Sequence, residues 1–348
     1  MTLLLLAFLS LDPLPVSDAP TQAIAVDLNK DGHLDLAVLC EHGLRTILRD
    51  GKAWRTVTEL NLPGAPVSIT AADFDRDGKL DLAVADHDTF GVQLLRGDGQ
   101  GNLVKHAMLR AKTTGTPHIH GLQGGDFNRD GAPDILFVSS GEGELIVLIN
   151  DGHGAFTPGK AFKTARFAWH PAVGDVNGDG FPDAVSADFD GNTIAVALGD
   201  GKGGFTRGTI AQVFARPFYP KLADLNGDGH LDIFSVHDDH GRFTLLQGDG
   251  KGGFTQIAGS PIDIGREAYG LAALDANADG KLDLVATAGD ELVVFQQTGK
   301  LQFAKSAKGI NGVGGYHVSL ADLDADGKPE LIIPDAKEKR VEFFQLRQ

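Results

Sequence analysis

One acidic pattern of nine residues recurs seven times along this chain of 348 residues, and no other feature restricts the possible folds so strongly. Each copy reads Asp-x-[Asp/Asn]-x-Asp-Gly-x-x-Asp, and only the last copy ends in Glu. A single match would be an ordinary turn, but seven regularly spaced matches indicate one repeated structural unit. The oxygen-bearing residues at positions 1, 3, 5 and 9 are Asp27, Asn29, Asp31, Asp35, Asp73, Asp75, Asp77, Asp81, Asp126, Asn128, Asp130, Asp134, Asp175, Asn177, Asp179, Asp183, Asp224, Asn226, Asp228, Asp232, Asp275, Asn277, Asp279, Asp283, Asp322, Asp324, Asp326 and Glu330.

The spacing of these oxygens predicts a metal loop. Side chains at alternate positions of a tight turn converge on one point, and Gly at position 6 permits the sharp bend. Ca²⁺ takes about six to eight oxygen ligands, so we predict up to seven structural Ca²⁺ ions, with the carboxylate at position 9 closing each shell. An EF-hand is not expected, because position 12 carries no Glu and the flanks read as strands. Glu330 changes the reach of the closing ligand, so the seventh site should be the weakest.

Negative charge is concentrated in these loops. They hold 23 of the 47 Asp and Glu residues, which leaves 24 acidic residues against 31 Lys and Arg elsewhere. Seven divalent ions would change the formal net charge from −16 to −2. The charge distribution therefore favours cations as partners and excludes nucleic acid.

The period of the repeat predicts the fold. Consecutive copies begin 46, 53, 49, 49, 51 and 47 residues apart, and a period near fifty with strand-like content is typical of propeller blades. In each unit an apolar strand precedes the loop, two more follow it, and a glycine turn such as residues 199–205 leads to an outer strand. We predict an all-β fold with a single domain over residues 1–348: a seven-bladed β-propeller of four-stranded antiparallel blades.

With these loops, the chain resembles the FG-GAP/VCBS repeat family, the seven-bladed propellers of integrin α-subunit heads and of many secreted bacterial proteins. The resemblance covers essentially the whole chain and rests on the seven loops and on the glycine turns at residues 199–205 and 248–254. It implies that each loop binds Ca²⁺ between the first and second strands of a blade. Lectins, adhesion domains and lyases share this scaffold, so the resemblance does not name a ligand.

The ring must also close. The chain ends with the third strand of the seventh blade at residues 341–344, so its fourth strand has to come from elsewhere. Residues 9–21 align with residues 60–67, which form the outer strand of the first blade. We therefore expect residues 1–20 to supply the closing strand, or in part a signal segment.

The start of the chain leaves its compartment open to two interpretations. Residues 3–11 are apolar but too short to span a bilayer, so we expect no transmembrane segment. These residues suit the apolar core of a signal peptide. Against that interpretation, no Lys or Arg precedes them, since the first basic residue is Lys30. The lone Cys40 excludes an internal disulfide and is expected in the core. Because extracellular calcium is abundant, we predict a secreted or periplasmic protein. We also expect the protein to be a monomer.

A second set of residues lies five to eight positions before each first loop Asp. It contains all three tyrosines and one of the two tryptophans, whereas most other aromatic residues are Phe, so these positions should be partly solvated. Six to eight strand residues span roughly 20–26 Å, which places this rim on the face opposite the calcium loops. The candidate ligand-binding residues are His118, His120, Trp169, His170, Arg216, Tyr219, Glu267, Tyr269, Tyr316 and His317.

These residues support a main hypothesis and a competing one. The main hypothesis is a binding module that takes a glycan or an extracellular protein in the central funnel. Packing of a narrow channel would also explain the large rings. The alternative is a polysaccharide lyase, with His120 or His170 as the base, Tyr219 or Tyr269 as the proton donor, and Arg216 neutralising a uronate. Whether the protein is an enzyme stays open.

Two smaller patterns in the sequence also bear on function. His118 and His120 share one face of a strand and, with His170 or His317, would hold zinc or copper, although chance explains a pair at this spacing better. Residues 96–98 read Arg-Gly-Asp, an adhesion tripeptide, but they belong to a glycine turn and we treat the match as incidental.

Overall fold

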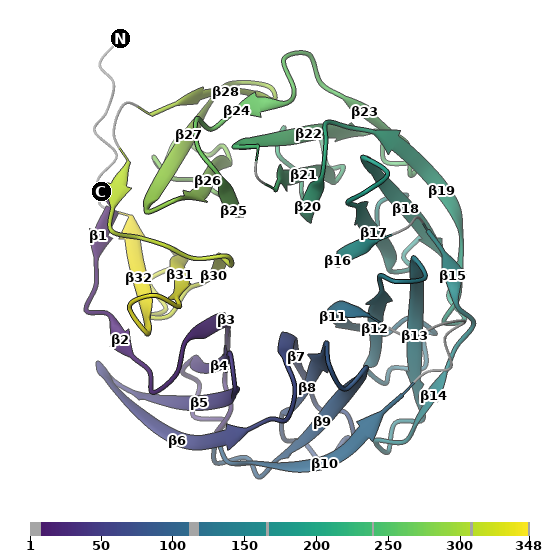
Figure 1. Ribbon diagram of the computed structural model, residues 1–348, viewed down its shortest axis with the longest axis vertical. Helices are drawn as coiled ribbons and strands as arrows, with labels where there is room; N and C mark the ends of the chain where they lie inside the picture. The colour runs from purple at the N-terminus through teal and green to yellow at the C-terminus, as the bar shows by residue number, and fades with distance from the viewer. Residues whose placement is uncertain (1–7, 111–117, 165–166, 239, 307–308, 347–348) are drawn as a thin grey trace.

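A computed structural model gives the fold and describes residues 8–110, 118–164, 167–238, 240–306 and 309–346. Seven antiparallel sheets form a closed ring around a central axis (Figure 1), which confirms the predicted all-β, seven-bladed propeller. Within the described part there are strands but no helix, and so none long and apolar enough to cross a membrane.

Each blade has four strand positions, counted outward from the axis, and the blades are numbered in chain order. The innermost strands are β3 (Pro20–Val26), β7 (Pro66–Ala72), β11 (Ile119–Gly125), β16 (Ala168–Gly174), β20 (Pro217–Ala223), β25 (Ala268–Leu274) and β30 (Ser319–Ala321). The second strands are β4 (Asp35–Cys40), β8 (Asp81–Asp86), β12 (Asp134–Ser139), β17 (Asp183–Asp188), β21 (Asp232–His237), β26 (Asp283–Ala288) and β31 (Glu330–Asp335).

The third and outer strands complete the blades. The third strands are β5 (Gly43–Asp50), β9 (Gly91–Gly97), β13 (Glu144–Asn150), β18 (Thr193–Gly199), β22 (Arg242–Gly248), β27 (Glu291–Gly299) and β32 (Arg340–Leu346). The outer strands of blades 1 to 6 are β6 (Ala53–Asn61), β10 (Leu103–Leu109), β14 (Phe156–Pro158) with β15 (Phe162–Lys163), β19 (Phe205–Gln212), β23 (Phe254–Gln256) with β24 (Ile262–Asp263), and β28 (Gln302–Lys305) with β29 (Ile310–Asn311).

The outer strand is therefore split in blades 3, 5 and 6, which the regular repeat did not predict. In blade 3, β14 ends at Pro158, whose missing N–H cannot continue the ladder. The chain resumes pairing with the same third strand at Phe162.

The second strands are buried along their whole length, for example all six residues of β4, β12 and β26. They read as nearly continuous apolar runs because both of their faces pack against neighbouring blades. Phe74 of blade 2 packs in one cluster with Phe137 of blade 3. The core is thus a series of layers between blades.

The N-terminus supplies the outer strand of blade 7, so the predicted closure of the ring is confirmed. Strands β1 (Phe8–Ser10) and β2 (Leu14–Pro15) pair antiparallel with β32, with Ser10 opposite Phe344 and Leu14 opposite Val341 (Figure 1). We call β1 and β2 the latch. The alternative of a signal segment falls largely on residues 1–7, which lie outside the described residues.

Apolar side chains seal the junction of blades 7 and 1. Leu14 and Val16 pack against a buried cluster that contains Phe343 and Cys40, so the predicted core position of the cysteine is confirmed. Burial raises the pKa of the Cys40 thiol to about 12. The ring of Trp54 in β6 stacks on Phe343 with centroids 5.6 Å apart. Both ends of the chain therefore contribute to one apolar contact.

We expect Leu14→Ala to weaken this closure, because its side chain packs on the cluster at the junction. The free energy of unfolding should fall by about 2 kcal/mol, the lower end of the range for truncating a leucine. Denaturant unfolding would measure the loss. Leu9→Ala, in the same latch but with Leu9 37% exposed, is the control and should change little. Equal stability of the two variants would contradict a closing role for the latch.

Candidate functional site

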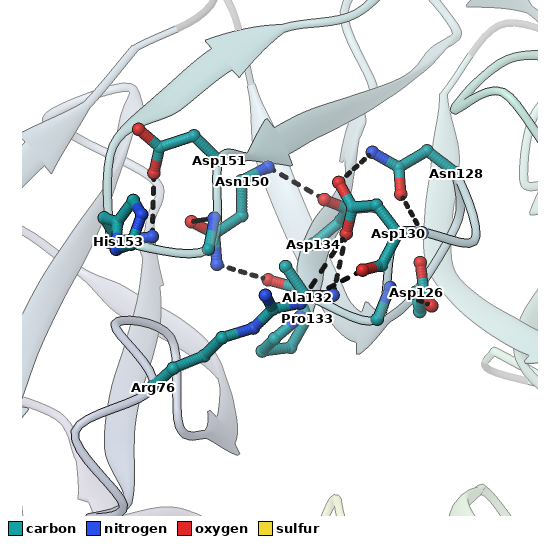
Figure 2. Close-up of polar contacts among 12 residues, drawn as sticks. Arg76, Asp126, Asn128, Asp130, Ala132, Pro133, Asp134, Asn150, Asp151 and His153 are labelled. Atoms are coloured by element: carbon teal, nitrogen blue, oxygen red, sulfur yellow. Dashed lines mark hydrogen bonds and ion pairs between the residues drawn. The ribbon is translucent and has the colours of Figure 1, made fainter.

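The acidic loops connect the first and second strands on one face of the ring. In blade 3, Asp126 Oδ2 accepts a hydrogen bond from Gly131 N at 2.9 Å, and Asn128 Oδ1 accepts one from Asp130 N at 3.0 Å. Figure 2 shows the side chains of positions 1, 3 and 5 gathered at the bend. Positions 4 and 6 have positive φ in every loop, as Arg129 does at 62° and Gly131 at 80°. All residues predicted from the sequence as metal ligands lie in these seven loops.

The ninth position has an additional role that the sequence did not reveal. Asp134 is fully buried, and its two oxygens accept hydrogen bonds from Phe127 N at 3.0 Å and from Asn150 N at 2.8 Å (Figure 2). The carboxylate thereby ties the loop to the third strand of the blade. The residues that make the same two bonds in blades 1 to 6 are Asp35, Asp81, Asp134, Asp183, Asp232 and Asp283.

Blade 7 departs from this pattern at the residue that departs in sequence. Glu330 Oε2 accepts a hydrogen bond from Leu323 N at 2.7 Å. Its other oxygen, Oε1, is buried and has no hydrogen-bond partner among the described residues. The longer side chain thus keeps the bond within the loop and loses the bond to the third strand.

The loop oxygens fit a hard cation. Buried oxygens without a hydrogen-bond partner also occur at Asp73 Oδ1, Asp126 Oδ1 and Asn226 Oδ1, at positions 1 and 3 of their loops. In loops 2 and 7, carboxylate oxygens from positions 1, 3 and 9 lie within 4.8 Å of one another. Like charges this close repel, and donor sets made only of oxygen suit Ca²⁺.

Burial raises the pKa of the ninth-position carboxyl in every blade, and neighbouring loop carboxylates raise it further. Two backbone amides oppose the shift in blades 1 to 6, and one amide opposes it in blade 7. The groups whose pKa is raised to about 6 are Asp81, Asp134, Asp232 and Asp283. Without a cation these groups would be partly protonated slightly below neutral pH.

Neighbouring blades are joined on the loop face. The carbonyl at position 2 of one loop accepts a hydrogen bond from the glycine-turn region of the next blade. The acceptor and donor pairs are Phe74 O with Asn150 Nδ2 (2.7 Å), Phe127 O with Gly203 N (3.0 Å), Val176 O with Gly252 N (3.2 Å) and Leu225 O with Gln297 Nε2 (2.6 Å). Arg76 adds a direct link between loops, because its Nη2 donates to Asp130 O at 3.2 Å (Figure 2).

The candidate ligand-binding residues lie at the opposite end of the innermost strands, where the pairing is irregular. In blade 3 the register with β12 shifts around His120, and in blade 6 the register with β26 shifts around Tyr269. In blades 4 and 5 the irregular segments include His170 at φ +21° and Tyr219 at φ +48°. Such bulges turn side chains out of the normal alternation of a strand.

Five of these residues form one ring cluster across the central mouth. The ring centroids of His120 and Trp169 are 3.8 Å apart, those of His170 and Tyr219 are 4.0 Å apart, and those of Tyr219 and His317 are 4.7 Å apart. His170 is only 9% exposed. The sequence placed these residues on one rim but did not show that they converge, and the structure brings their rings into contact.

Burial disfavours the charged form of the histidines in the ring cluster. Burial lowers the pKa of His120 and of His317 to about 3 and holds that of His170 well below its usual value. Burial also raises the pKa of Tyr219 above its ordinary range. Trp169 Nε1 and His317 Nε2 are buried without a hydrogen-bond partner in the described part of the chain.

Tyr269 and Tyr316 form a separate pair at the boundary of blades 6 and 7. Their ring centroids are 4.6 Å apart, and the Tyr269 hydroxyl donates to Glu267 Oε2 at 3.1 Å. Tyr316 is 55% exposed. The two rings line a hollow of about 470 Å³ together with Gly289, Asp290, Gly312, Gly314, Gly315, Asp335, Ala336, Lys337 and Glu338.

The remaining candidates lie at the edges of the ring cluster. Arg216 forms an ion pair with Asp238 at 3.1 Å, and its guanidinium lies 4.3 Å from the ring centre of Phe189. His118 lies beside His87, with ring centroids 4.7 Å apart. His87 could not be found by counting back from the loops, because it follows a second strand, in the β8–β9 hairpin, and the repeat marks only the innermost strands. His87, and not His170 or His317, completes a group of three with His118 and His120, so that part of the zinc or copper hypothesis was wrong.

The comparisons with known proteins agree with this architecture. The model of the FG-GAP-like repeat matches residues 27–84, 73–137, 126–186, 175–235, 224–286 and 275–333, which cover most of the chain. The chain belongs to the FG-GAP-like repeat family. A comparison with curated protein sequences finds no match.

Solved propellers resemble this FG-GAP-like chain in fold. BBS1N, crystallised in complex with ARL6DN and soaked with lead, is 14% identical with a TM-score of 0.67, over 98% of this chain and 97% of that chain. A protein from Lactobacillus plantarum is 14% identical with a TM-score of 0.66, over 86% of both chains. An Agrocybe aegerita lectin that recognises non-reducing terminal N-acetylglucosamine is 18% identical with a TM-score of 0.59, over 94% of this chain and 86% of that chain. At these identities the likeness concerns the fold.

We expect Asp134→Ala to be strongly destabilising, because it leaves two backbone amides without their acceptor. At about 1–3 kcal/mol for each unsatisfied buried group, the free energy of unfolding should fall by roughly 3 kcal/mol. Asp151→Ala is the matched control, since Asp151 also accepts two backbone N–H groups in blade 3 but lies at the surface. Urea unfolding should show a much smaller loss for the control, and equal losses would contradict the structural role of the buried acid.

Proposed function

We propose that this FG-GAP-like propeller is a secreted or periplasmic binding module that is stabilised by calcium and binds a carbohydrate on the face opposite its calcium loops. The observation that carries the proposal is the hollow at the boundary of blades 6 and 7, with its tyrosine pair. A volume of about 470 Å³ suits a small ligand of one or two sugar rings.

The chemistry of this hollow suits a sugar. The exposed face of Tyr316 offers an apolar surface for the C–H face of a pyranose. Carboxylates accept hydrogen bonds from sugar hydroxyls, and Asp290 and Glu338 line the hollow. Glu267 holds the Tyr269 hydroxyl at 3.1 Å and so fixes the orientation of that ring.

The charge of the hollow narrows the class of sugar. Three carboxylates, those of Asp290, Asp335 and Glu338, line it with one ammonium group, that of Lys337. Arg266, outside the lining, pairs with Asp290 at 3.3 Å, and negative charge still exceeds positive charge. This balance favours neutral or amino sugars over uronates, whose carboxylates would be repelled. The likeness to a lectin that recognises N-acetylglucosamine supports the same class.

The lyase alternative has less support. Arg216, its proposed uronate partner, already holds Asp238 at 3.1 Å. His120 has a pKa lowered to about 3 by burial, which makes it a poor proton acceptor. Tyr219 is buried enough for its pKa to rise, and it packs between His170 and His317.

Tyr316→Ala is the direct test of the sugar site. On an array of neutral, amino and uronic glycans we expect the chain to bind neutral or amino sugars, and we expect the substitution to weaken binding about tenfold, or roughly 1.4 kcal/mol. Tyr269→Phe keeps the ring and removes the bond to Glu267, so its effect should be smaller. Phe167→Ala removes another exposed aromatic ring in blade 4 and serves as the control. Unchanged binding by Tyr316→Ala, or preference for uronates, would reject the proposal.

Calcium has a structural role in the same proposal. The loops lie on the face opposite the hollow, and each ion that binds only the folded chain contributes roughly 2.7 kcal/mol at a hundredfold excess over its dissociation constant. The buried oxygens without partners at Asp73, Asp126, Asn226 and Glu330 support this role.

Melting temperatures measured with Ca²⁺ and with chelator at several pH values would test the calcium role. Four of the ninth-position acids, Asp81, Asp134, Asp232 and Asp283, have a folded-state pKa of about 6 against an ordinary 3.8 for Asp, so the metal-free folded chain binds more protons than the unfolded chain between about pH 4 and 6. The contribution of these groups to metal-free stability should therefore increase as the pH falls through that window. Ca²⁺ requires the ionised form, so its stabilising effect should be large at pH 7 and smaller at pH 5. Melting that is indifferent to chelator at pH 7 would contradict the proposal.

A further inference from the structure

Three histidines from two neighbouring blades meet on the rim, away from the tyrosine hollow. His87 lies in the β8–β9 hairpin of blade 2, and His118 and His120 lie at the start of the innermost strand of blade 3. One ring nitrogen of each lies within 4.8 Å of the other two. The ring centroids are 4.7 Å apart for His87 and His118, and 5.0 Å apart for His87 and His120.

The backbone holds these positions. His87 N donates to Ala65 O at 2.9 Å, and His118 O accepts hydrogen bonds from Ser140 N at 2.7 Å and from Ser140 Oγ at 3.0 Å. His120 occupies the irregular step of β11 between Ile119 and Gly121, so the bulge and not the strand alternation decides where its ring points. The three side chains thus start from fixed anchors in two blades.

The hairpin that carries His87 is itself braced. The buried carboxylate of Asp86 accepts hydrogen bonds from Asp88 N at 3.0 Å and from Thr89 N at 2.7 Å. This arrangement keeps Asp88 beside His87, where Asp88 Oδ1 lies 2.9 Å from His87 Nδ1. A carboxylate on one ring nitrogen fixes the tautomer and leaves the lone pair of the other nitrogen available, as is typical of histidines that bind metal.

Packing restricts the other two rings. The Trp169 ring lies 3.8 Å from that of His120, and the Phe90 ring lies 5.9 Å from that of His118 in a stacked arrangement. Apolar neighbours of this kind surround metal centres and limit access of solvent. The group also differs from the acidic loops, because its donors are three nitrogens and it lies on the opposite face of the ring.

We propose that His87, His118 and His120 form a binding site for a divalent transition-metal ion such as Zn²⁺. Imidazole nitrogen is a preferred ligand of zinc, copper and nickel, whereas Ca²⁺ takes oxygen. Zn–N bonds of about 2.0–2.1 Å place ligand nitrogens roughly 3.4 Å apart, so modest rotation of the rings completes three positions of a tetrahedron. Water or a ligand group takes the fourth position. The ion would join blades 2 and 3 on the rim, where the calcium loops do not reach.

Calorimetric titration of the full chain with Zn²⁺ in excess Ca²⁺ tests the site. We expect one Zn²⁺ per chain, with an affinity that Ca²⁺ does not reduce, and we expect His87→Ala and His118→Ala each to weaken it at least tenfold. Co²⁺ in place of Zn²⁺ should give the visible absorption of a tetrahedral nitrogen site. His153→Ala, at a histidine in a turn on the loop face, is the control and should bind as the unaltered chain does.

Asp88→Asn separates metal binding from folding, because the side chain is exposed and all three rings remain. It should weaken Zn²⁺ binding about tenfold and leave the melting temperature in Ca²⁺ unchanged. Zn²⁺ affinity that is equal in the unaltered chain, Asp88→Asn and the His87→Ala/His118→Ala double variant would overturn the proposal. Displacement of Zn²⁺ by added Ca²⁺ would overturn it as well, since that result would place the ion in the acidic loops.

Discussion

The fold depends on a buried carboxylate that begins the second strand of each blade. In blades 1 to 6, Asp134 and its equivalents accept one amide from their own loop and one from the third strand, so a single side chain fixes the bend and the hairpin together. Hydrogen bonds to a charged acceptor are strong, but burial penalises the charge, as the raised pKa shows. These two effects oppose each other, so a positive charge added beside the carboxylate would strongly favour its ionised form. The repeat of the acidic pattern and the repeat of the blade therefore have the same physical basis.

As a result, the loop face of the ring is regular and the opposite rim is irregular. On the loop face, carbonyls of one blade accept hydrogen bonds from the next, for example Phe127 O from Gly203 N, and Arg76 reaches a neighbouring loop. Bonds of this kind join four pairs of neighbouring blades, with a backbone or a side-chain amide as the donor. The rim has irregular strand starts and hairpins whose residues differ from blade to blade. A face fixed by repetition leaves the opposite face free to carry different side chains, and there the tyrosine pair and the histidine group lie.

Much of the architecture could be predicted because it is encoded locally. The number of loops determined the number of blades, and a chain that ends with a third strand at residues 341–344 indicated closure by the N-terminus. Counting back from Asp126 and Asp275 placed His120 and Tyr269 on the rim correctly. These inferences needed only the repeat and the length of a strand.

Other features depend on contacts between blades and could not be predicted from the repeat. The bulge at His120 depends on how β11 and β12 pair, and the place of His87 beside it depends on a hairpin of another blade. The separation of Tyr269 and Tyr316 from the ring cluster follows from packing across the mouth, which fills the space between Trp169 and His317 but leaves a hollow beside blade 7. The repeat in the sequence does not indicate which residues at the seven equivalent positions contact one another.

The latch affects how the protein folds during its synthesis. Because Ser10 pairs with Phe344, the last sheet cannot be completed until nearly the whole chain has left the ribosome. During synthesis the growing arc ends in an unpaired edge, and edges of this kind attract other strands. The early blades must therefore remain soluble for as long as translation of the remaining repeats takes.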